Sequence, residues 1–269
     1  MNLSRFFVSA AAFAALSLTG GLCFAQTSAT LNPKFIGTWK ENEAKRQIGA
    51  SVPLRFRQTG AQLEELRGPE GKPLVQPVNF GAKAYAIDNS KNTIEWKQID
   101  ATHFERRIYE NGKLLTTRRI SLTSDGKMLT EITERPDNDV TTVMFMRASG
   151  DGKGLPGTWK PETIHTSRPA QVKVEALGAN GVKVTSDRGV VDTVTFDGKP
   201  NAVTGPAVIS GTMITARLIS PNKIENTGTR EGTVSGTTTI ELSADGKTLT
   251  ETTKLPSGGA PSVTVYEKQ

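Results

Sequence analysis

The strongest constraint on the fold is an internal repeat with an offset of 120 residues. Gly37-Thr38-Trp39-Lys40 returns as Gly157-Thr158-Trp159-Lys160, and 8 of the 13 positions from 121 to 133 are identical to those from 241 to 253. Solenoid repeats are far shorter, about 20–50 residues, whereas a 120-residue period is the size of a whole domain. The repeat therefore predicts two domains that share one fold.

A glycine-rich stretch separates the two copies of the repeat. Residues 148–154 contain three glycines and show no apolar periodicity, a pattern that is typical of a linker. We therefore expect unit 1 to span residues 31–147 and unit 2 to span residues 155–269, joined by this linker.

Each unit has the sequence pattern of an all-β domain. Polar and apolar residues alternate in runs such as Val172–Ala176 and Gly181–Thr185, and turn residues such as Asn111-Gly112 separate the runs. Only Glu41–Ile48 offers room for a short helical turn. About eight strands in each unit, at this spacing, predict a small antiparallel barrel or sandwich.

The first 25 residues have the pattern of an export signal. Arg5 is their only charged residue, Phe6–Leu18 is almost wholly apolar, and Cys23-Phe24-Ala25 offers a small-x-small cleavage site. We expect cleavage after Ala25 and a periplasmic or secreted protein, which then has no cysteine. The rival interpretation, a lipid anchor on Cys23, is disfavoured by the bulky Leu22 before it.

Three short motifs carry a resemblance to a known family. The opening Gly37-Thr38-Trp39-Lys40, the turn at Asp245-Gly246-Lys247 and the ending Val265-Tyr266-Glu267-Lys268 resemble the calycins, which include lipocalins and fatty-acid-binding proteins. They also resemble exported bacterial domains with the same opening and ending. The resemblance implies two tandem antiparallel lipocalin-like barrels, each with a tryptophan that closes one end.

The ligand clamp of the fatty-acid-binding proteins is absent from both units. The resemblance would place an arginine two residues before the tyrosine of the last strand, but Thr264 stands there in unit 2 and Met144 in unit 1. Met146 also replaces the tyrosine itself in unit 1. The barrel resemblance therefore remains, and fatty-acid binding does not carry over.

No residue pattern selects an enzyme or a metal site. His103 and His165 lie at non-equivalent places in different units and are expected on the surface; Asp137-Asn138-Asp139 is expected to be a hairpin turn rather than a calcium loop. The adjacent Glu64 and Glu65 point to opposite faces of a strand. We therefore expect no enzyme, no cofactor and no metal.

Net charge and hydropathy limit the kinds of partner that the protein is expected to have. The net charge of +6 is too small for a dedicated nucleic-acid binder, and no run of the sequence is apolar for long enough to cross a bilayer as a helix. The expected partner is a small-molecule ligand; nothing in the sequence identifies a protein partner.

Unit 1 has the side chains to line a ligand cavity. It holds nine aromatic residues against three in unit 2, and a net charge of +4 against +1. Arg106 and Arg118 share strand faces with aliphatic residues, so either would need an anionic partner inside a barrel. The candidate ligand site comprises Arg106, Arg118, Trp96, Phe104, Phe145 and Met144, of which Met144 and Phe145 cannot both face inward. The alternative is that these aromatic residues simply fill the core.

These observations favour an exported, non-enzymatic binding protein with a small amphipathic or anionic ligand in unit 1. The alternative is a cell-envelope structural or protein-interaction module whose barrels are filled. An empty interior of about 300 Å³ or more would favour ligand binding.

Overall fold

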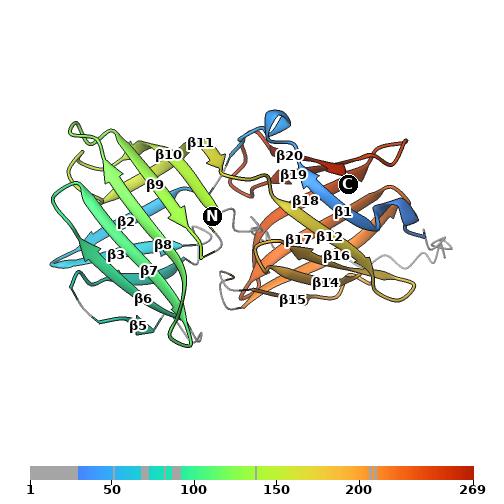
Figure 1. Ribbon diagram of the computed structural model, residues 1–269, viewed down its shortest axis with the longest axis horizontal. Coiled ribbons are helices and arrows are strands. Elements are labelled where there is room, and N and C mark those ends of the chain that lie inside the picture. The colour runs from blue at the N-terminus through green and yellow to red at the C-terminus, as the bar shows by residue number, and fades with distance from the viewer. Residues whose placement is uncertain are drawn as a thin grey trace, which may run out of the picture.

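The computed structural model shows an all-β protein with two barrel-like sheets that lie side by side (Figure 1). Apart from strands it contains two single turns of 3-10 helix, Pro33–Phe35 (η1) and Glu43–Lys45 (η2). No helix among the described residues is long and apolar enough to span a membrane. The structure describes residues 30–50, 52–67, 73–81, 83–86, 92–136, 138–205, 208 and 211–269.

The expected signal segment, residues 1–25, lies outside the described residues. The expected helical turn in Glu41–Ile48 is confirmed as η2.

Barrel 1 is the sheet formed by strands β2 to β11. Its order is β4-β3-β2-β11-β10-β9-β8-β7-β6-β5, so β4 and β5 are its edges. An isolated parallel bridge joins Phe80, two residues after β4, to Trp96 on β6. The strands are β2 (Leu54–Thr59), β3 (Gln62–Arg67), β4 (Leu74–Val78), β5 (Tyr85–Ala86), β6 (Asn92–Gln98), β7 (His103–Glu110), β8 (Lys113–Leu122), β9 (Met128–Glu134), β10 (Val140–Ser149) and β11 (Gly157–Thr166).

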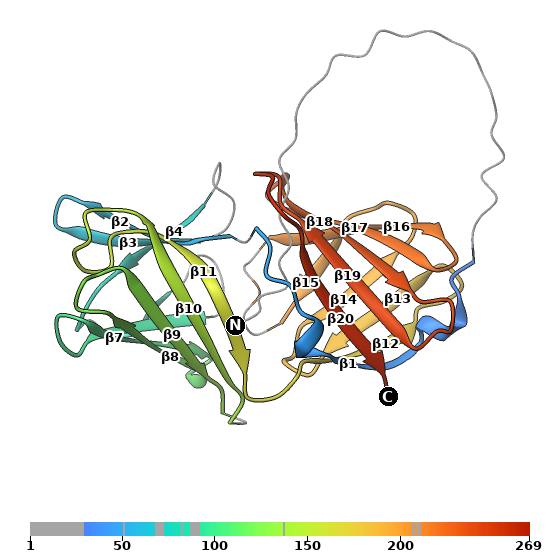
Figure 2. The ribbon, with the colours of Figure 1, turned by 90° about the horizontal axis from the view of Figure 1, so that it is seen from above.

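Barrel 2 is a closed sheet of β1 and β12 to β20. Figure 2 shows β1 lying beside β12 and β20. Its strands are β1 (Gly37–Glu41), β12 (Gln171–Ala176), β13 (Gly181–Ser186), β14 (Val191–Thr195), β15 (Asn201–Thr204), β16 (Thr212–Ser220), β17 (Lys223–Arg230), β18 (Thr233–Leu242), β19 (Thr248–Lys254) and β20 (Ser262–Lys268).

Each sheet has ten strands, which corrects the expected eight. The sequence pattern did not indicate β4 or β17. It also did not indicate the two shortest strands, β5 with two residues and β15 with four. Strands of this length show too little alternation to be recognised in a sequence. Other alternating runs were predicted correctly; β7 and β8, for example, meet at the expected Asn111-Gly112 turn, where both residues have positive φ.

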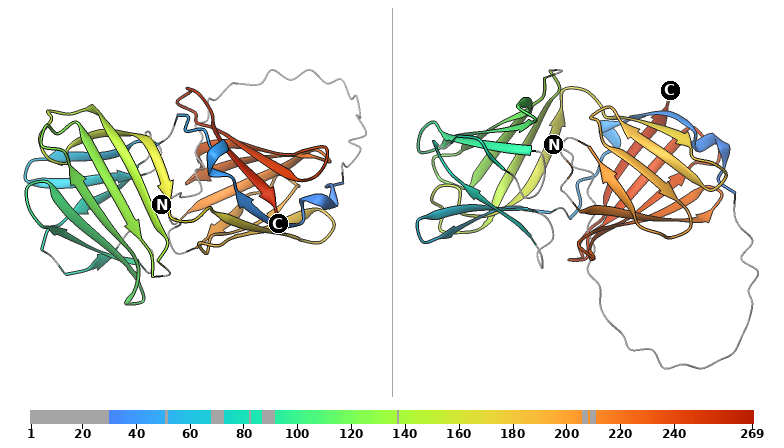
Figure 3. Two further views of the ribbon diagram at one scale, coloured as in Figure 1. Left: turned by 45° about the horizontal axis from the view of Figure 1, so that its top comes forward. Right: turned by 90° about the horizontal axis from the view of Figure 1, so that it is seen from below.

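The two copies of the repeat exchange their first strands. In barrel 2, β1 from unit 1 pairs with β12 and β20; in barrel 1, β11 from unit 2 pairs with β10 and β2. Figure 3 shows the chain crossing between the barrels after β1 and again after β11. Barrel 1 is therefore one continuous stretch, 54–166, inserted between β1 and β12 of barrel 2.

Strand pairing thus crosses the expected boundary between units 31–147 and 155–269. Residues 148 and 149 end β10, and residues 150–154 belong to the connection between the hydrogen-bonded strands β10 and β11, not to a linker between barrels. Arg147 holds this connection by donating hydrogen bonds to the carbonyl oxygens of Gly126, Gly154 and Pro156. A Cβ on Gly157 would lie 2.3 Å from a backbone oxygen, so this close approach requires glycine.

The two repeated tryptophans occupy equivalent, fully buried positions, as the repeat predicts. The indole Nε1 of Trp39 donates to the carbonyl oxygen of Phe35, and that of Trp159 donates to Leu155, each at 2.9 Å. Because their strands are exchanged, Trp39 packs in the core of barrel 2 and Trp159 in that of barrel 1.

Candidate functional site in the barrel interiors

The interior of barrel 1 contains two buried ion pairs. Arg106 on β7 lies opposite Arg118 on β8, and both side chains are almost completely buried. Arg106 Nη1 donates to Glu65 on β3, and Arg118 Nη1 donates to Glu131 Oε2 on β9 at 3.0 Å. The expected inward arginines are therefore present, and the anions that they contact are carboxylates of the chain itself.

A third guanidinium makes this cluster a cationic one. Arg67 follows Glu65 on the same face of β3, so three arginines stand against two glutamates. Burial raises the pKa of Glu65, but the positive charges of Arg106, Arg67 and Arg118 outweigh this and lower the pKa. Burial lowers the pKa of Arg67 to about 10.

Several buried donors near this cluster lack a hydrogen-bond partner within the described part of the chain. They are Arg67 Nη2, Arg106 Nε and Nη2, Gln76 Nε2 and Trp96 Nε1. Since buried polar groups in proteins are nearly always hydrogen-bonded, such donors indicate a place for water or an anion.

The predicted aromatic residues pack into the core of barrel 1. Trp96, Phe104 and Phe145 are all buried there, and the Arg106 guanidinium lies 5.5 Å from the centre of the Trp96 ring. Met144 lies on the opposite face of β10 from Phe145 and is not part of this interior. The structure thus brings together five of the six predicted residues.

The cavity that the structure shows most clearly lies in barrel 2, whereas the sequence favoured a cavity in unit 1. Its volume is about 210 Å³, below the expected threshold for ligand binding. Valine and isoleucine are the commonest residues of its walls, among them Val174, Val184, Val194, Ile214, Ile224 and Ile240.

Smaller side chains at repeated positions account for this cavity. In barrel 1, Trp96, Phe104, Arg106 and Arg118 fill the interior; the residues 120 positions later are Ala216, Ile224, Asn226 and Thr238. The register is preserved, because Trp96 pairs with Arg106 just as Ala216 pairs with Asn226. The scarcity of aromatic residues in unit 2 was the signal for the cavity.

Asp192 is the most unusual polar group of the barrel 2 cavity. It points inward from β14, where its neighbours across the sheet are Val184 and Val203. Its Oδ1 atom is buried and has no hydrogen-bond partner in the described part of the chain. Burial alone raises the pKa of Asp192 to about 6.

Other charged groups of the cavity have partners in the protein. Arg46 Nε lies 2.6 Å from Glu41 Oε1, and Arg46 Nη1 donates to the carbonyl oxygen of Ile164 on β11. Glu251 also lines the cavity, beside Tyr266, whose pKa is raised well above its usual value by burial and then by Glu251 and Glu41.

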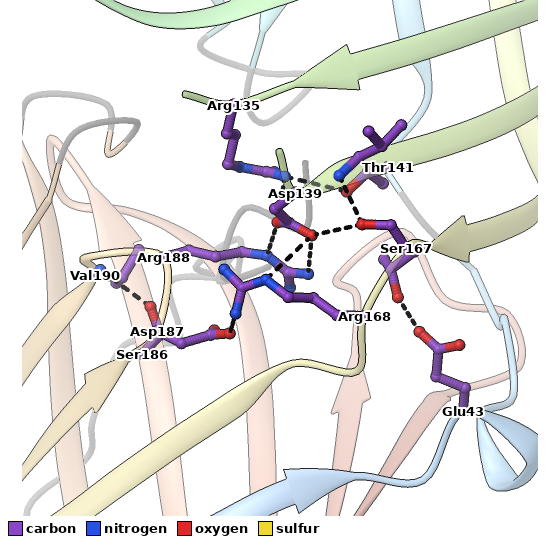
Figure 4. A network of polar contacts seen from close by, with 12 residues as sticks. Glu43, Arg135, Asp139, Thr141, Ser167, Arg168, Ser186, Asp187, Arg188 and Val190 are labelled. Atoms are coloured by element: carbon purple, nitrogen blue, oxygen red, sulfur yellow. Dashed lines mark hydrogen bonds and ion pairs between the residues drawn. The ribbon is translucent and has the colours of Figure 1, made fainter. Parts of the chain in front are cut away.

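A polar network joins the two barrels at one end of this cavity (Figure 4). The fully buried Asp139 carboxylate lies 2.6 Å from Arg135, 2.8 Å from Arg188 and 3.7 Å from Arg168. Ser167 Oγ also donates to it, at 3.3 Å. Asp139 was expected only as part of a hairpin turn; Asp137 of that turn lies outside the described residues.

The two histidines lie on different strands and are exposed, as expected. His103 contacts Asp100 at 2.9 Å, and His165 lies on β11 rather than in a loop. Among the described residues, no three His, Cys, Asp or Glu side chains are grouped so that they could hold a metal ion.

Comparisons with protein-family models, with curated proteins and with solved structures found no match for this chain.

Proposed function

We propose that this chain is an exported binding protein, related in fold to the calycins, that holds a small apolar or amphipathic ligand inside barrel 2. The observation that carries the proposal is the cavity of about 210 Å³ within a closed barrel. Because this volume is below the roughly 300 Å³ that favours drug-sized ligands, the cavity suits only a small ligand. Its lining combines apolar walls with polar groups that could orient such a ligand. The signal pattern of residues 1–25 supports export, and the lack of a nucleophile or acid–base set among the described residues of either barrel favours binding over catalysis.

A second candidate site is the cationic cluster of barrel 1. The donors of Arg67, Arg106, Gln76 and Trp96 that lack protein partners within the described residues favour a small anion there. This keeps the expectation of an anionic ligand in barrel 1, although the ion pairs with Glu65 and Glu131 already offset most of the charge.

The proposal can be tested with N-phenyl-1-naphthylamine, a neutral apolar fluorophore. We expect saturable binding to the wild-type protein and weakening of about tenfold or more by Ile224→Phe, which places the residue of barrel 1 in the cavity wall. The matched control is Ile219→Phe, since Ile219 is 51% exposed. Failure of the wild-type protein to bind the probe would favour the alternative, an interaction module of the cell envelope.

Export is tested separately by the mass of the protein recovered from its native compartment. Cleavage after Ala25 gives a mature chain that begins at Gln26. Recovery of the full-length chain from the cytoplasm alone would contradict the export proposal.

A further inference from the structure

The charges that line the barrel 2 cavity are unevenly balanced. Four acidic residues line it, and only two basic ones. The basic pair is already engaged, because Arg46 contacts Glu41 and Arg188 contacts Asp139 outside the cavity wall. Asp187 is bound by Arg168. The cavity therefore has an acidic excess, opposite in sign to the cluster in barrel 1.

Asp192 differs from the other acids of this cavity in its surroundings. Valines flank it across the sheet on both sides, and no side chain of the described residues donates to its Oδ1 atom. A carboxylate in apolar surroundings is costly unless it is paired with a cation or protonated. Barrel 1 resolves the same difficulty with arginines, whereas no arginine of the described residues forms an ion pair with Asp192.

We propose that barrel 2 selects amphipathic amines, whose ammonium group pairs with the Asp192 carboxylate while the apolar part packs against the valine and isoleucine walls. This inference rests on the proposed function, because it assigns the ligand class of the same cavity. A primary ammonium is a compact donor that remains charged at neutral pH, and a carboxylate held in a dry site discriminates strongly against neutral analogues.

The pairing makes binding depend on pH. Burial raises the pKa of Asp192 to about 6, so the carboxylate is mostly protonated at pH 5 and mostly ionised at pH 7.5. The other ionisable groups that face the cavity are Glu41, Arg46, Asp187, Arg188, Glu251 and Tyr266. The pKa values of Tyr266 and Arg188 are both raised, so both groups keep their protons between pH 5 and 7.5 and neither changes charge. Amine affinity should therefore increase from pH 5 to 7.5.

The test compares 2-phenylethylamine with 2-phenylethanol, which share one carbon skeleton, as competitors of bound N-phenyl-1-naphthylamine. For the wild-type protein at pH 7.5 we expect the amine to compete about tenfold or more better than the alcohol. Asp192→Asn should reduce this preference to about threefold or less, and so should lowering the pH to 5.

The matched control is Asp197→Asn. Asp197 lies two residues after the end of β14 and is exposed, so its variant makes the same chemical change outside the cavity and should keep the amine preference. If the fluorophore binds but amine and alcohol compete equally, or if Asp192→Asn keeps the preference, the inference is overturned and the proposed function stands. If the fluorophore binds to no form of the protein, both are overturned.

Discussion

Asp192→Asn should stabilise the protein in the absence of any ligand, and more so as the pH rises. Burial raises the pKa of this carboxyl from 3.8 to about 6, and its Oδ1 atom accepts no hydrogen bond from the described residues. Below about pH 4 the folded and unfolded states both hold the proton, so the group has little effect on stability there. Above this pH the unfolded state loses its proton first, and the folded state becomes progressively less stable relative to it.

The size of the effect follows from the pKa difference. A shift of one pKa unit corresponds to about 1.4 kcal/mol, so the difference between 3.8 and 6 gives roughly 3 kcal/mol once the pH exceeds 7. We take about 2–3 kcal/mol, because part of the side chain remains accessible to water. Asparagine has the shape of the carboxyl group but never ionises, so the variant avoids this cost.

Urea denaturation at pH 3.5, 6 and 8 measures the effect directly. The free energy of unfolding of Asp192→Asn should match that of the wild type at pH 3.5 within about 1 kcal/mol and exceed it by about 2–3 kcal/mol at pH 8. Asp197→Asn is the control of opposite sign: hydrogen bonds from Lys199 and Thr195 lower the pKa of Asp197, so this variant should not stabilise at pH 8. A difference between Asp192→Asn and wild type that is the same at pH 3.5 and pH 8 would refute the assignment of a buried, unpaired carboxylate.

Three further predictions concern the ion pairs and the strand exchange. Arg106→Met leaves Glu65 buried without its principal cation and should lower the free energy of unfolding by about 3–5 kcal/mol. Arg57→Met removes an exposed ion pair and should change the free energy of unfolding by less than about 1 kcal/mol. Urea denaturation distinguishes the two variants. Burial raises the pKa of Asp139, but Arg188, Arg135 and Arg168 outweigh burial, so the pKa is lowered overall. The stability that this carboxylate contributes is therefore present above pH 4 and is lost as the pH falls. Asp139→Asn should destabilise the protein most at pH 7, and equal destabilisation at pH 2.5 would contradict this. A fragment of residues 52–169 contains every strand of barrel 1 and should fold as a monomer with a cooperative thermal transition by circular dichroism; an unfolded fragment would show that barrel 1 depends on β1 or barrel 2.

Local patterns in the sequence predicted the strands and the repeat but not the strand exchange. The alternation in β7 and β8 and the Asn111-Gly112 turn are properties of neighbouring residues, so they can be seen without the fold. The strands β1 and β11 both begin Gly-Thr-Trp-Lys, and a strand that fits one barrel therefore fits the other. Which barrel each enters depends on connections and on the packing of the whole chain.

The candidate site was predicted in part for a similar reason. The inward face of Arg106 and Arg118 follows from alternation, but their partner Glu65 lies 41 residues before Arg106 and meets it only in the folded sheet. The sequence leaves open whether the aromatic residues of unit 1 line a cavity or fill the core, and in barrel 1 they fill the interior. The cavity lies in barrel 2, where Ala216 and Thr238 leave the space that Trp96 and Arg118 occupy in barrel 1.

The insertion of barrel 1 into barrel 2 sets an order in which the chain can fold. Barrel 1 is continuous from β2 to β11, so all its strands can pair as soon as the ribosome has released residue 166. Barrel 2 cannot form until the end of the chain has been made, because β1 pairs with β20. Asn42, for example, forms a hydrogen bond with Glu267 across 225 residues of sequence. Contacts between such distant residues form slowly because the loop-closure entropy is lost first. A folding intermediate with barrel 1 complete and β1 still unpaired should therefore precede the native state, and closing barrel 2 around its cavity is the last step.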